Sequence, residues 1–283
     1  MVDKSALKAS ITELRQLQKD FHKSLRTRLD RLEEELEGAL SDEPAADAVG
    51  PSHDWTERSD HRDHLYQFIA YGDMRPIHAV LDVGCGMGHV AEQLPGYLMP
   101  PGRYEGFDVR ANVIAKVQKR PIGTRYPHFR FRHANIYNKR YNPEGTVAAS
   151  EFVFPYDDES FDFVFAFSVF THMFPPDMDH YLAEISRVLK PGRRCLLTYF
   201  LLNEELERLI DAGIMRKTFR HRGEHYRYDN EEVPENALAI EESFVRQTYA
   251  RHGLKILEPV RYGIWCGRAG AETRQDMIVA VKE

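Results

Sequence analysis

Three glycines at alternate positions follow an acid in the stretch Ala79–Gly88. Glycine adopts the positive φ angles of a tight turn and lets a backbone lie close to a ligand. The apolar run Val80–Val83 before them is typical of a buried parallel strand, so the loop after it should bind a nucleotide-like molecule. The residues expected to contact that molecule are Asp82, Gly84, Cys85, Gly86 and Gly88.

The acid in this stretch indicates which kind of nucleotide binds. A dinucleotide fingerprint would need a glycine at position 89, where the chain has His89. Asp82 would also repel a pyrophosphate, which disfavours a nicotinamide dehydrogenase. A carboxylate instead suits a cation, and S-adenosylmethionine carries an ammonium and a sulfonium but no phosphate. We therefore expect S-adenosylmethionine as the cofactor and S-adenosylhomocysteine as its product.

Polar residues end three further expected strands. Asp108 ends a strand at 104–109, where its carboxylate can accept both ribose hydroxyls of a nucleoside, and it can also cap the helix that follows. Asn135 follows a strand at 129–133, and its amide oxygen can accept a hydrogen bond from an adenine amino group. Carboxyl ends of parallel strands share one edge of a sheet, so these side chains should lie near each other.

His172 follows the third of these strands, the apolar run 161–169. Imidazole titrates near neutral pH and could remove the proton of an alcohol nucleophile. We therefore expect His172 to be the catalytic base. The alternative is that it orders the loop by hydrogen bonding. Methyl transfer depends mainly on in-line positioning, so a base can contribute modestly.

The elements that carry these residues alternate along the chain. Strands are expected at 79–83, 104–109, 129–133, 161–169 and 194–201, and helices near 90–94, 111–119 and 179–189. Such alternation predicts an α/β fold with a parallel sheet. The last strands, 254–262 and 277–281, have only a glycine-rich loop between them and should form an antiparallel hairpin. We predict a Rossmann-like, seven-stranded mixed sheet that is mostly parallel, with helices on both faces.

The acid-x-Gly-x-Gly-x-Gly pattern resembles the first motif of class I methyltransferases, and the element pattern extends the resemblance over 75–203 and 254–283. The family places its cofactor against the carboxyl ends of the first four strands. The resemblance implies that Asp108 and Val109 hold the ribose, Asn135 and Ile136 the adenine, and Ser168 and Val169 the methionine end. Asn135 departs from the family, which usually has an acid at this position.

The acceptor is less well determined by the sequence. The stretches 168–172 and 245–276 resemble a bacterial methyltransferase subgroup that accompanies glycan-building enzymes. This resemblance implies O-methylation of a sugar, a glycan or another polar metabolite. The insertion 203–251 should cover the acceptor, because its aromatic, basic and imidazole groups suit a polar substrate. The candidate substrate residues are His225, Tyr226, Trp265, Arg268 and Asp276, although an exposed loop and core packing are the alternatives.

Two other functions remain open. The chain could be a catalytically silent member of the fold that serves assembly, or it could methylate the nitrogen of a small metabolite. The net charge of -6 disfavours a nucleic-acid partner. Two histidine pairs, His61 with His64 and His221 with His225, lack an evident third ligand, so no metal is expected.

Leucines and other apolar residues recur at threes and fours over 4–40, which predicts a long N-terminal amphipathic helix. Basic residues dominate its first part and acidic residues its second, so antiparallel copies would match in charge. We expect a coiled coil that makes the protein a homo-oligomer; the alternative is that it folds back on its own domain. Residues 41–52 are typical of a linker, and 53–283 should form the methyltransferase domain.

Three cysteines without close spacing indicate a reducing compartment and no disulfide framework. No apolar run approaches the length of a membrane span. We therefore expect a cytoplasmic protein.

Overall fold

The computed structural model describes residues 64–213, 215, 218–268 and 273–283. The N-terminal helix predicted at 4–40, the linker 41–52 and His61 lie outside the described residues. None of the described helices is long and apolar enough to cross a membrane.

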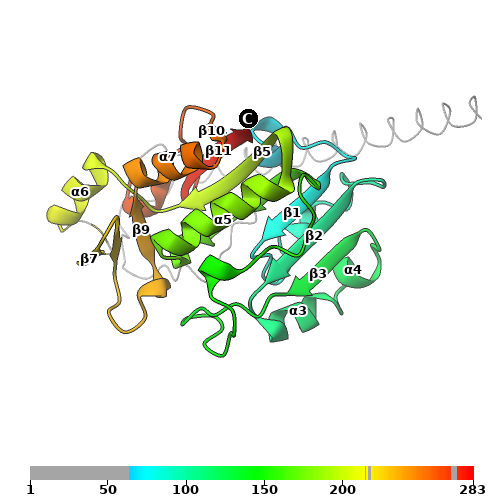
Figure 1. The fold of residues 1–283 in the computed structure, drawn as a ribbon, viewed down its shortest axis with the longest axis horizontal. Helices are drawn as coiled ribbons and strands as arrows, with labels where there is room; N and C mark the ends of the chain where they lie inside the picture. Colours follow the sequence, from blue (N-terminus) through cyan, green and yellow to red (C-terminus); the bar gives the residue numbers. More distant parts are fainter. Residues whose placement is uncertain (1–63, 214, 216–217, 269–272) are drawn as a thin grey trace, which may run out of the picture. The chain divides into compact units, whose positions relative to one another are not determined.

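Seven strands form the main sheet in the order β10-β11-β5-β4-β1-β2-β3 (Figure 1). They are β1 Ala79–Val83, β2 Arg103–Asp108, β3 Phe129–His133, β4 Phe161–Ala166, β5 Leu189–Tyr199, β10 Leu254–Ile256 and β11 Asp276–Lys282. β11 runs antiparallel to both of its neighbours, β10 and β5, and the other strand pairs of this sheet are parallel. The predicted mixed sheet with a terminal antiparallel hairpin is therefore confirmed.

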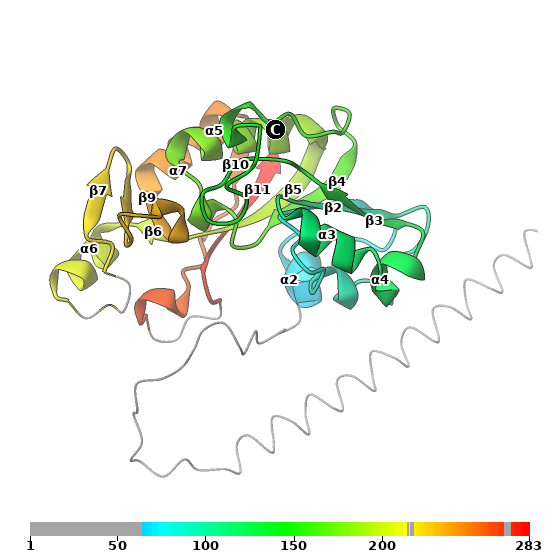
Figure 2. The same cartoon turned by 90° about the horizontal axis from the view of Figure 1, so that it is seen from below.

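Helices cover both faces of this sheet (Figure 2). Successive strand side chains point to opposite faces. Val80 and Phe163 accordingly pack with α2 His64–Ala70, α3 Ala111–Val117 and α4 Pro121–Thr124. Leu81 and Val164 pack on the other face with α5 Pro175–Val188 and α7 Glu242–Arg251. The central strands are buried on both sides, which explains why the sequence of β4 is an unbroken apolar run apart from Asp162.

Local chemistry shifts three element boundaries from the predicted ones. The helix expected at 90–94 is a single 3-10 turn, η1 Ala91–Gln93, and prolines follow at positions 95, 100 and 101, where they cannot continue a helix. Two prolines open α5, because a missing N–H costs nothing in the first turn. Residues 190–192, between the predicted helix 179–189 and the predicted strand 194–201, lie within β5, where the register against β4 shifts and Gly192 has a φ of 71°.

A second sheet extends from the carboxyl end of β5, in the order β6-β9-β8-β7 (Figure 1). Its elements are β6 Leu201–Leu202, α6 Glu204–Asp211, β7 His221–Gly223, β8 Tyr226–Tyr228 and β9 Leu238–Glu241. Phe200, Leu206 and Phe219 fill a separate small core beneath it. Val245 and Tyr249 of α7 instead lie in the main core. The part of the insertion that stands apart from the main sheet thus ends at Glu241.

Short 3-10 turns complete the fold. They are η2 Ala149–Glu151, η3 Phe170–His172, η4 Pro234–Asn236 and η5 Ile264–Cys266. Two of them, η3 after β4 and η4 within the insertion, meet at the carboxyl edge of the main sheet.

Candidate active site

The glycine loop after β1 has the backbone that its sequence predicts. Gly84, Gly86 and Gly88 have φ angles of 78°, 51° and 76°, all in the left-handed region. A Cβ atom on Gly84 would lie 2.5 Å from Cγ2 of Val169, which follows β4. The loop therefore lies directly against the turn after β4, and a side chain at Gly84 would separate them.

Asp82 lies beneath this loop, almost completely buried. The Tyr104 hydroxyl donates a hydrogen bond to Asp82 Oδ2 at 2.6 Å. Burial raises the pKa of Asp82 from 3.8 to about 7, although the hydrogen bond from Tyr104 opposes the rise. A bound cation would favour the ionised carboxylate, so this site is poised to respond to a positively charged ligand.

Tyr104 was not a predicted site residue, and glycine at position 106 makes its contact possible. A Cβ on Gly106 would lie 2.8 Å from both the Tyr104 hydroxyl and Cβ of Cys85. One sequence pattern could have identified Tyr104. It is an aromatic residue on β2 with a glycine two residues later, and both positions lie on one face of the sheet.

Asp108 ends β2, with a carboxylate that is mostly buried. Its Oδ2 accepts a hydrogen bond from the Gly86 N–H at 2.9 Å, which ties the strand end to the glycine loop. The Arg110 side chain donates to the other carboxylate oxygen, Oδ1, through Nε at 3.0 Å. Val109, between the two, is half-buried and packs against the main core. Arg110 was not a predicted site residue.

Asn135 follows β3 with an exposed side chain. Its amide nitrogen donates to Thr146 Oγ1 at 3.0 Å, and its oxygen accepts from Asn142 Nδ2 at 3.1 Å. The amide is thus already paired on both sides, although its oxygen can accept a second hydrogen bond. Ile136 is buried in the main core next to it.

The turn after β4 brings Ser168 and Val169 to the glycine loop. Ser168 has a φ of 56°, an uncommon value for a residue other than glycine. Its N–H donates to Thr198 Oγ1 at 2.9 Å, and its hydroxyl donates to Gln275 Oε1 at 3.1 Å. Gln275, which the sequence analysis did not identify, also accepts from Thr198 at 2.7 Å. Two other segments, at Thr198 and at Gln275, therefore hold the strained backbone of Ser168 in place.

His172 lies at the end of η3, where two other segments contact its ring. Nδ1 is 2.7 Å from the backbone oxygen of Glu235 in η4, and Nε2 is 3.2 Å from the Tyr141 hydroxyl. The side chain of Glu235 is buried, and its Oε1 accepts from the Lys139 N–H at 3.2 Å. The insertion and the loop before Tyr141 therefore fix the position of this imidazole together.

The acceptor-side candidates of the C-terminal region form one buried polar cluster. Asp276 is fully buried and accepts from the N–H groups of Leu201 and Gly263, each at 2.8 Å. It also accepts from Trp265 Nε1 at 2.8 Å and from Arg268 Nη1 at 3.3 Å. Burial raises the pKa of Asp276 to about 6 despite these donors. The cluster joins β11 to β6 and η5, so these contacts are structural.

His225 and Tyr226 lie at the turn between β7 and β8. His225 Nδ1 is 2.9 Å from a Glu241 carboxylate oxygen, and its ring stacks on Phe244 with centroids 4.5 Å apart. The Tyr226 ring contacts Phe174, two residues after His172, at a centroid distance of 5.5 Å. The fold therefore brings Tyr226 beside the residues that follow His172.

No group of three potential metal ligands occurs among the residues that the structure describes. His221 and His225 lie on a hairpin rather than on one face of a helix, and His221 stacks on Tyr228 with centroids 4.9 Å apart.

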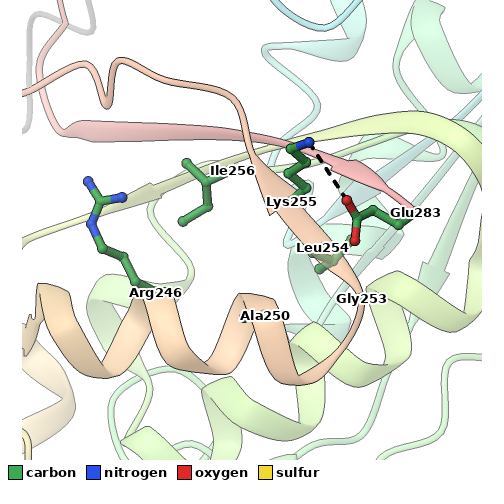
Figure 3. Close-up of a pocket in the computed structure, with 7 residues that line it drawn as sticks. All are labelled: Arg246, Ala250, Gly253, Leu254, Lys255, Ile256 and Glu283. Atoms are coloured by element: carbon green, nitrogen blue, oxygen red, sulfur yellow. Dashed lines mark ion pairs between the residues drawn. The ribbon is translucent and has the colours of Figure 1, made fainter.

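One surface cavity lies away from this edge of the sheet, between α7 and β10 (Figure 3). Its lining residues are Arg246, Ala250, Gly253, Leu254, Lys255, Ile256 and Glu283. Because Leu254 pairs with the last residues of β11 and Tyr199 with the first, the cavity lies near the amino ends of the parallel strands. The glycine loop and His172 lie at the opposite edge.

Comparison with known proteins indicates the family of this domain. Residues 81–197 match the methyltransferase domain family. Methyltransferase GfsG of Streptomyces halstedii is 27% identical over 158 residues, which are 54% of this chain and 47% of that protein. Phosphoethanolamine N-methyltransferase 2 of Caenorhabditis elegans is 25% identical over 130 residues, 46% of this chain and 25% of that protein. The chain thus spans less than half the length of these relatives.

A solved S-adenosylmethionine-dependent methyltransferase from Methanosarcina mazei has a similar fold, with a TM-score of 0.52 and 19% identity over 76% of this chain and 96% of that chain. The strand order, the glycine loop and the family match agree with one another. Residues 81–197 therefore form a methyltransferase domain, and the sheet that contains them has the fold of a solved S-adenosylmethionine-dependent methyltransferase.

Proposed function

We propose that the chain transfers the methyl group of S-adenosylmethionine to a hydroxyl oxygen of a polar acceptor, with a sugar or glycan as the preferred class. The observation that carries this proposal is the hydrogen bonding of His172. A backbone oxygen can only accept, so the 2.7 Å contact with Glu235 requires a proton on Nδ1. In the neutral imidazole Nε2 then carries no proton and its lone pair accepts a hydrogen bond, which is the form that a general base needs.

The Tyr141 hydroxyl is the group that Nε2 meets, at 3.2 Å. An acceptor hydroxyl can take its place as the donor to Nε2, or can donate to Tyr141 while Tyr141 donates to His172. In both cases the acceptor oxygen attacks the methyl carbon as the carbon–sulfur bond breaks. The bonding electrons go to sulfur, which leaves neutral S-adenosylhomocysteine. His172 gains one proton, which comes directly from the acceptor in the first case and from Tyr141 in the second, where Tyr141 takes the acceptor proton in exchange.

We assign the following roles to the cofactor-side residues. Asp82 faces the ammonium end of the cofactor, Asp108 the ribose, and Asn135 with Ile136 the adenine. Ser168 and Val169 line the methionine end beside Gly84. On the acceptor side we favour Tyr226 and His225, because Tyr226 packs on Phe174 next to the turn of His172. Trp265, Arg268 and Asp276 support the acceptor site by holding the second sheet against β11.

The alternatives remain nitrogen methylation, for which one relative is named, and a silent domain that serves assembly. A panel of sugars, sugar phosphates and amines, each incubated with S-adenosylmethionine and analysed by mass spectrometry, separates the three. Methylated sugar hydroxyls support the proposal. Methylated amines alone would replace it with the first alternative, and cofactor binding without any product would favour the second.

The role of His172 has its own test. His172→Ala should lower kcat by about 100-fold, because general base catalysis typically contributes this much or more. Its affinity for S-adenosylhomocysteine should remain that of the unmodified protein. His180→Ala is the matched control, since the contact of His180 Nε2, at 2.9 Å, is with the backbone oxygen of Phe152 and neither residue belongs to the glycine loop or to the turn of His172. Unchanged turnover in His172→Ala would remove the imidazole from the mechanism.

A further inference from the structure

The carboxylate of Asp108 has no free acceptor position for a ribose. Oδ1 accepts from the backbone N–H and from Nε of Arg110, both at 3.0 Å. Oδ2 accepts from the Gly86 N–H at 2.9 Å and from Arg110 Nη2 at 3.3 Å. An ionised carboxylate offers about four lone-pair positions, so all of them are in use. Two hydroxyls can bind there only when the Arg110 side chain leaves.

The guanidinium of Arg110 also lies across the glycine loop. A Cβ on Gly86 would lie 3.4 Å from Arg110 Nη2. On its other side, Arg110 Cζ is 5.2 Å from the centre of the Tyr141 ring. This side chain therefore occupies the space between the cofactor side of the site and the Tyr141–His172 pair.

A second guanidinium approaches the same ring. Arg140 Cζ is 5.0 Å from the centre of Tyr141, and Arg140 Nη1 donates to the backbone oxygen of Asn236 at 3.3 Å. Arg140 forms no ion pair with any residue that the structure describes. If Arg110 leaves Asp108, two guanidinium groups face the acceptor side with no carboxylate between them. Such groups bind carboxylates and phosphates through paired hydrogen bonds.

We propose that Arg110 exchanges the Asp108 carboxylate for an anionic group of the acceptor when the cofactor binds. This inference rests on the proposed function, because it names the chemical class of the acceptor: a carboxylate- or phosphate-bearing molecule. The ribose hydroxyls take the two positions on Asp108 that Arg110 vacates. An anion that holds the guanidinium away from Asp108 must then strengthen cofactor binding, and the cofactor must strengthen anion binding equally.

Calorimetric titration with S-adenosylhomocysteine tests the exchange without any acceptor. Arg110→Met should bind this ligand about tenfold more tightly than the unmodified protein, because the ribose no longer displaces two charge-assisted hydrogen bonds. Arg140→Met is the matched control: it flanks the same tyrosine but does not touch Asp108, and its affinity should not change. Arg110→Lys keeps the charge with fewer donors and should lie between the other two.

Inorganic phosphate at constant ionic strength tests the anion site. It should tighten binding of S-adenosylhomocysteine to the unmodified protein, tighten it less in Arg140→Met, and leave Arg110→Met unaffected. Weaker ligand binding by Arg110→Met would make Arg110 a cofactor ligand and overturn the proposal, as would unchanged binding. Equal phosphate effects in all variants would show a general ion effect and would also refute it. Failure to methylate hydroxyls would affect only the proposed reaction, since none of these titrations measures turnover.

Discussion

Replacing Asp82 with asparagine should stabilise the fold while weakening cofactor binding. Burial raises the pKa of Asp82 from 3.8 to about 7. At about 1.36 kcal/mol per pKa unit, ionising this carboxylate costs the folded state about 4 kcal/mol. Asparagine is neutral at every pH and its oxygen can still accept from Tyr104. Because the amide nitrogen needs a partner of its own, we expect a net gain of about 2 kcal/mol above pH 7.

The pH dependence distinguishes this cause from others. Between about pH 4 and pH 7 the folded protein keeps the Asp82 proton that the unfolded chain has released, so the stability of the unmodified protein falls as pH rises. Asp82→Asn lacks this dependence. The difference in unfolding free energy, measured by urea denaturation from pH 4 to 9, should grow up to pH 7 and then level off. A variant that is less stable at all pH values by a constant amount would refute the reasoning.

The same variant should bind S-adenosylmethionine more weakly, because the ammonium of the ligand loses its buried carboxylate. Calorimetry at pH 8, where Asp82 of the unmodified protein is mostly ionised, gives the largest contrast. Tyr104→Phe is the matched comparison, because it removes the hydrogen-bond donor that favours the ionised Asp82 carboxylate. The pKa of Asp82 should rise in this variant, so its cofactor affinity should begin to fall at a higher pH when the pH is lowered. Equal affinity of Asp82→Asn and the unmodified protein would exclude a charge contact at this position.

Three further changes have defined outcomes. Asp276→Ala should lower the unfolding free energy by about 3–5 kcal/mol, because it leaves Arg268 and three other donors without their buried acceptor; urea denaturation measures this, and a loss below about 1 kcal/mol would contradict the structural role. Gly84→Ala should weaken S-adenosylhomocysteine binding more than it lowers the thermal midpoint, since its Cβ would push Val169 away from the loop; calorimetry and thermal melts compare the two, and unaltered affinity would show that the contact is dispensable. A variant lacking residues 1–45 should be monomeric by light scattering, whereas retention of the full-length oligomeric state would disprove self-association through 4–40.

Local signals determined the fold and the cofactor loop. The apolar runs and their alternation with helices predicted the strands, because each strand of a covered parallel sheet must be apolar by itself. The alternate glycines predicted the loop because a positive φ depends on the single residue that adopts it. All three glycines have a positive φ. Element ends were less accurate, as in η1 and α5, where proline chemistry decides the boundary.

Long-range contacts decided the rest of the site. His172 was predicted from its position after β4, but Tyr141 and Glu235, which fix its tautomer, are 31 and 63 residues away. No local pattern links such residues, because the three segments meet only when the insertion folds over the sheet edge. The ten residues of the glycine loop and the strand pattern thus determined by themselves what kind of molecule binds. Only the tertiary structure decided that the Gly86 N–H and Arg110 together fill the Asp108 carboxylate. It also decided that Asp276 is a structural anchor, since the donors to its buried charge come from separate segments.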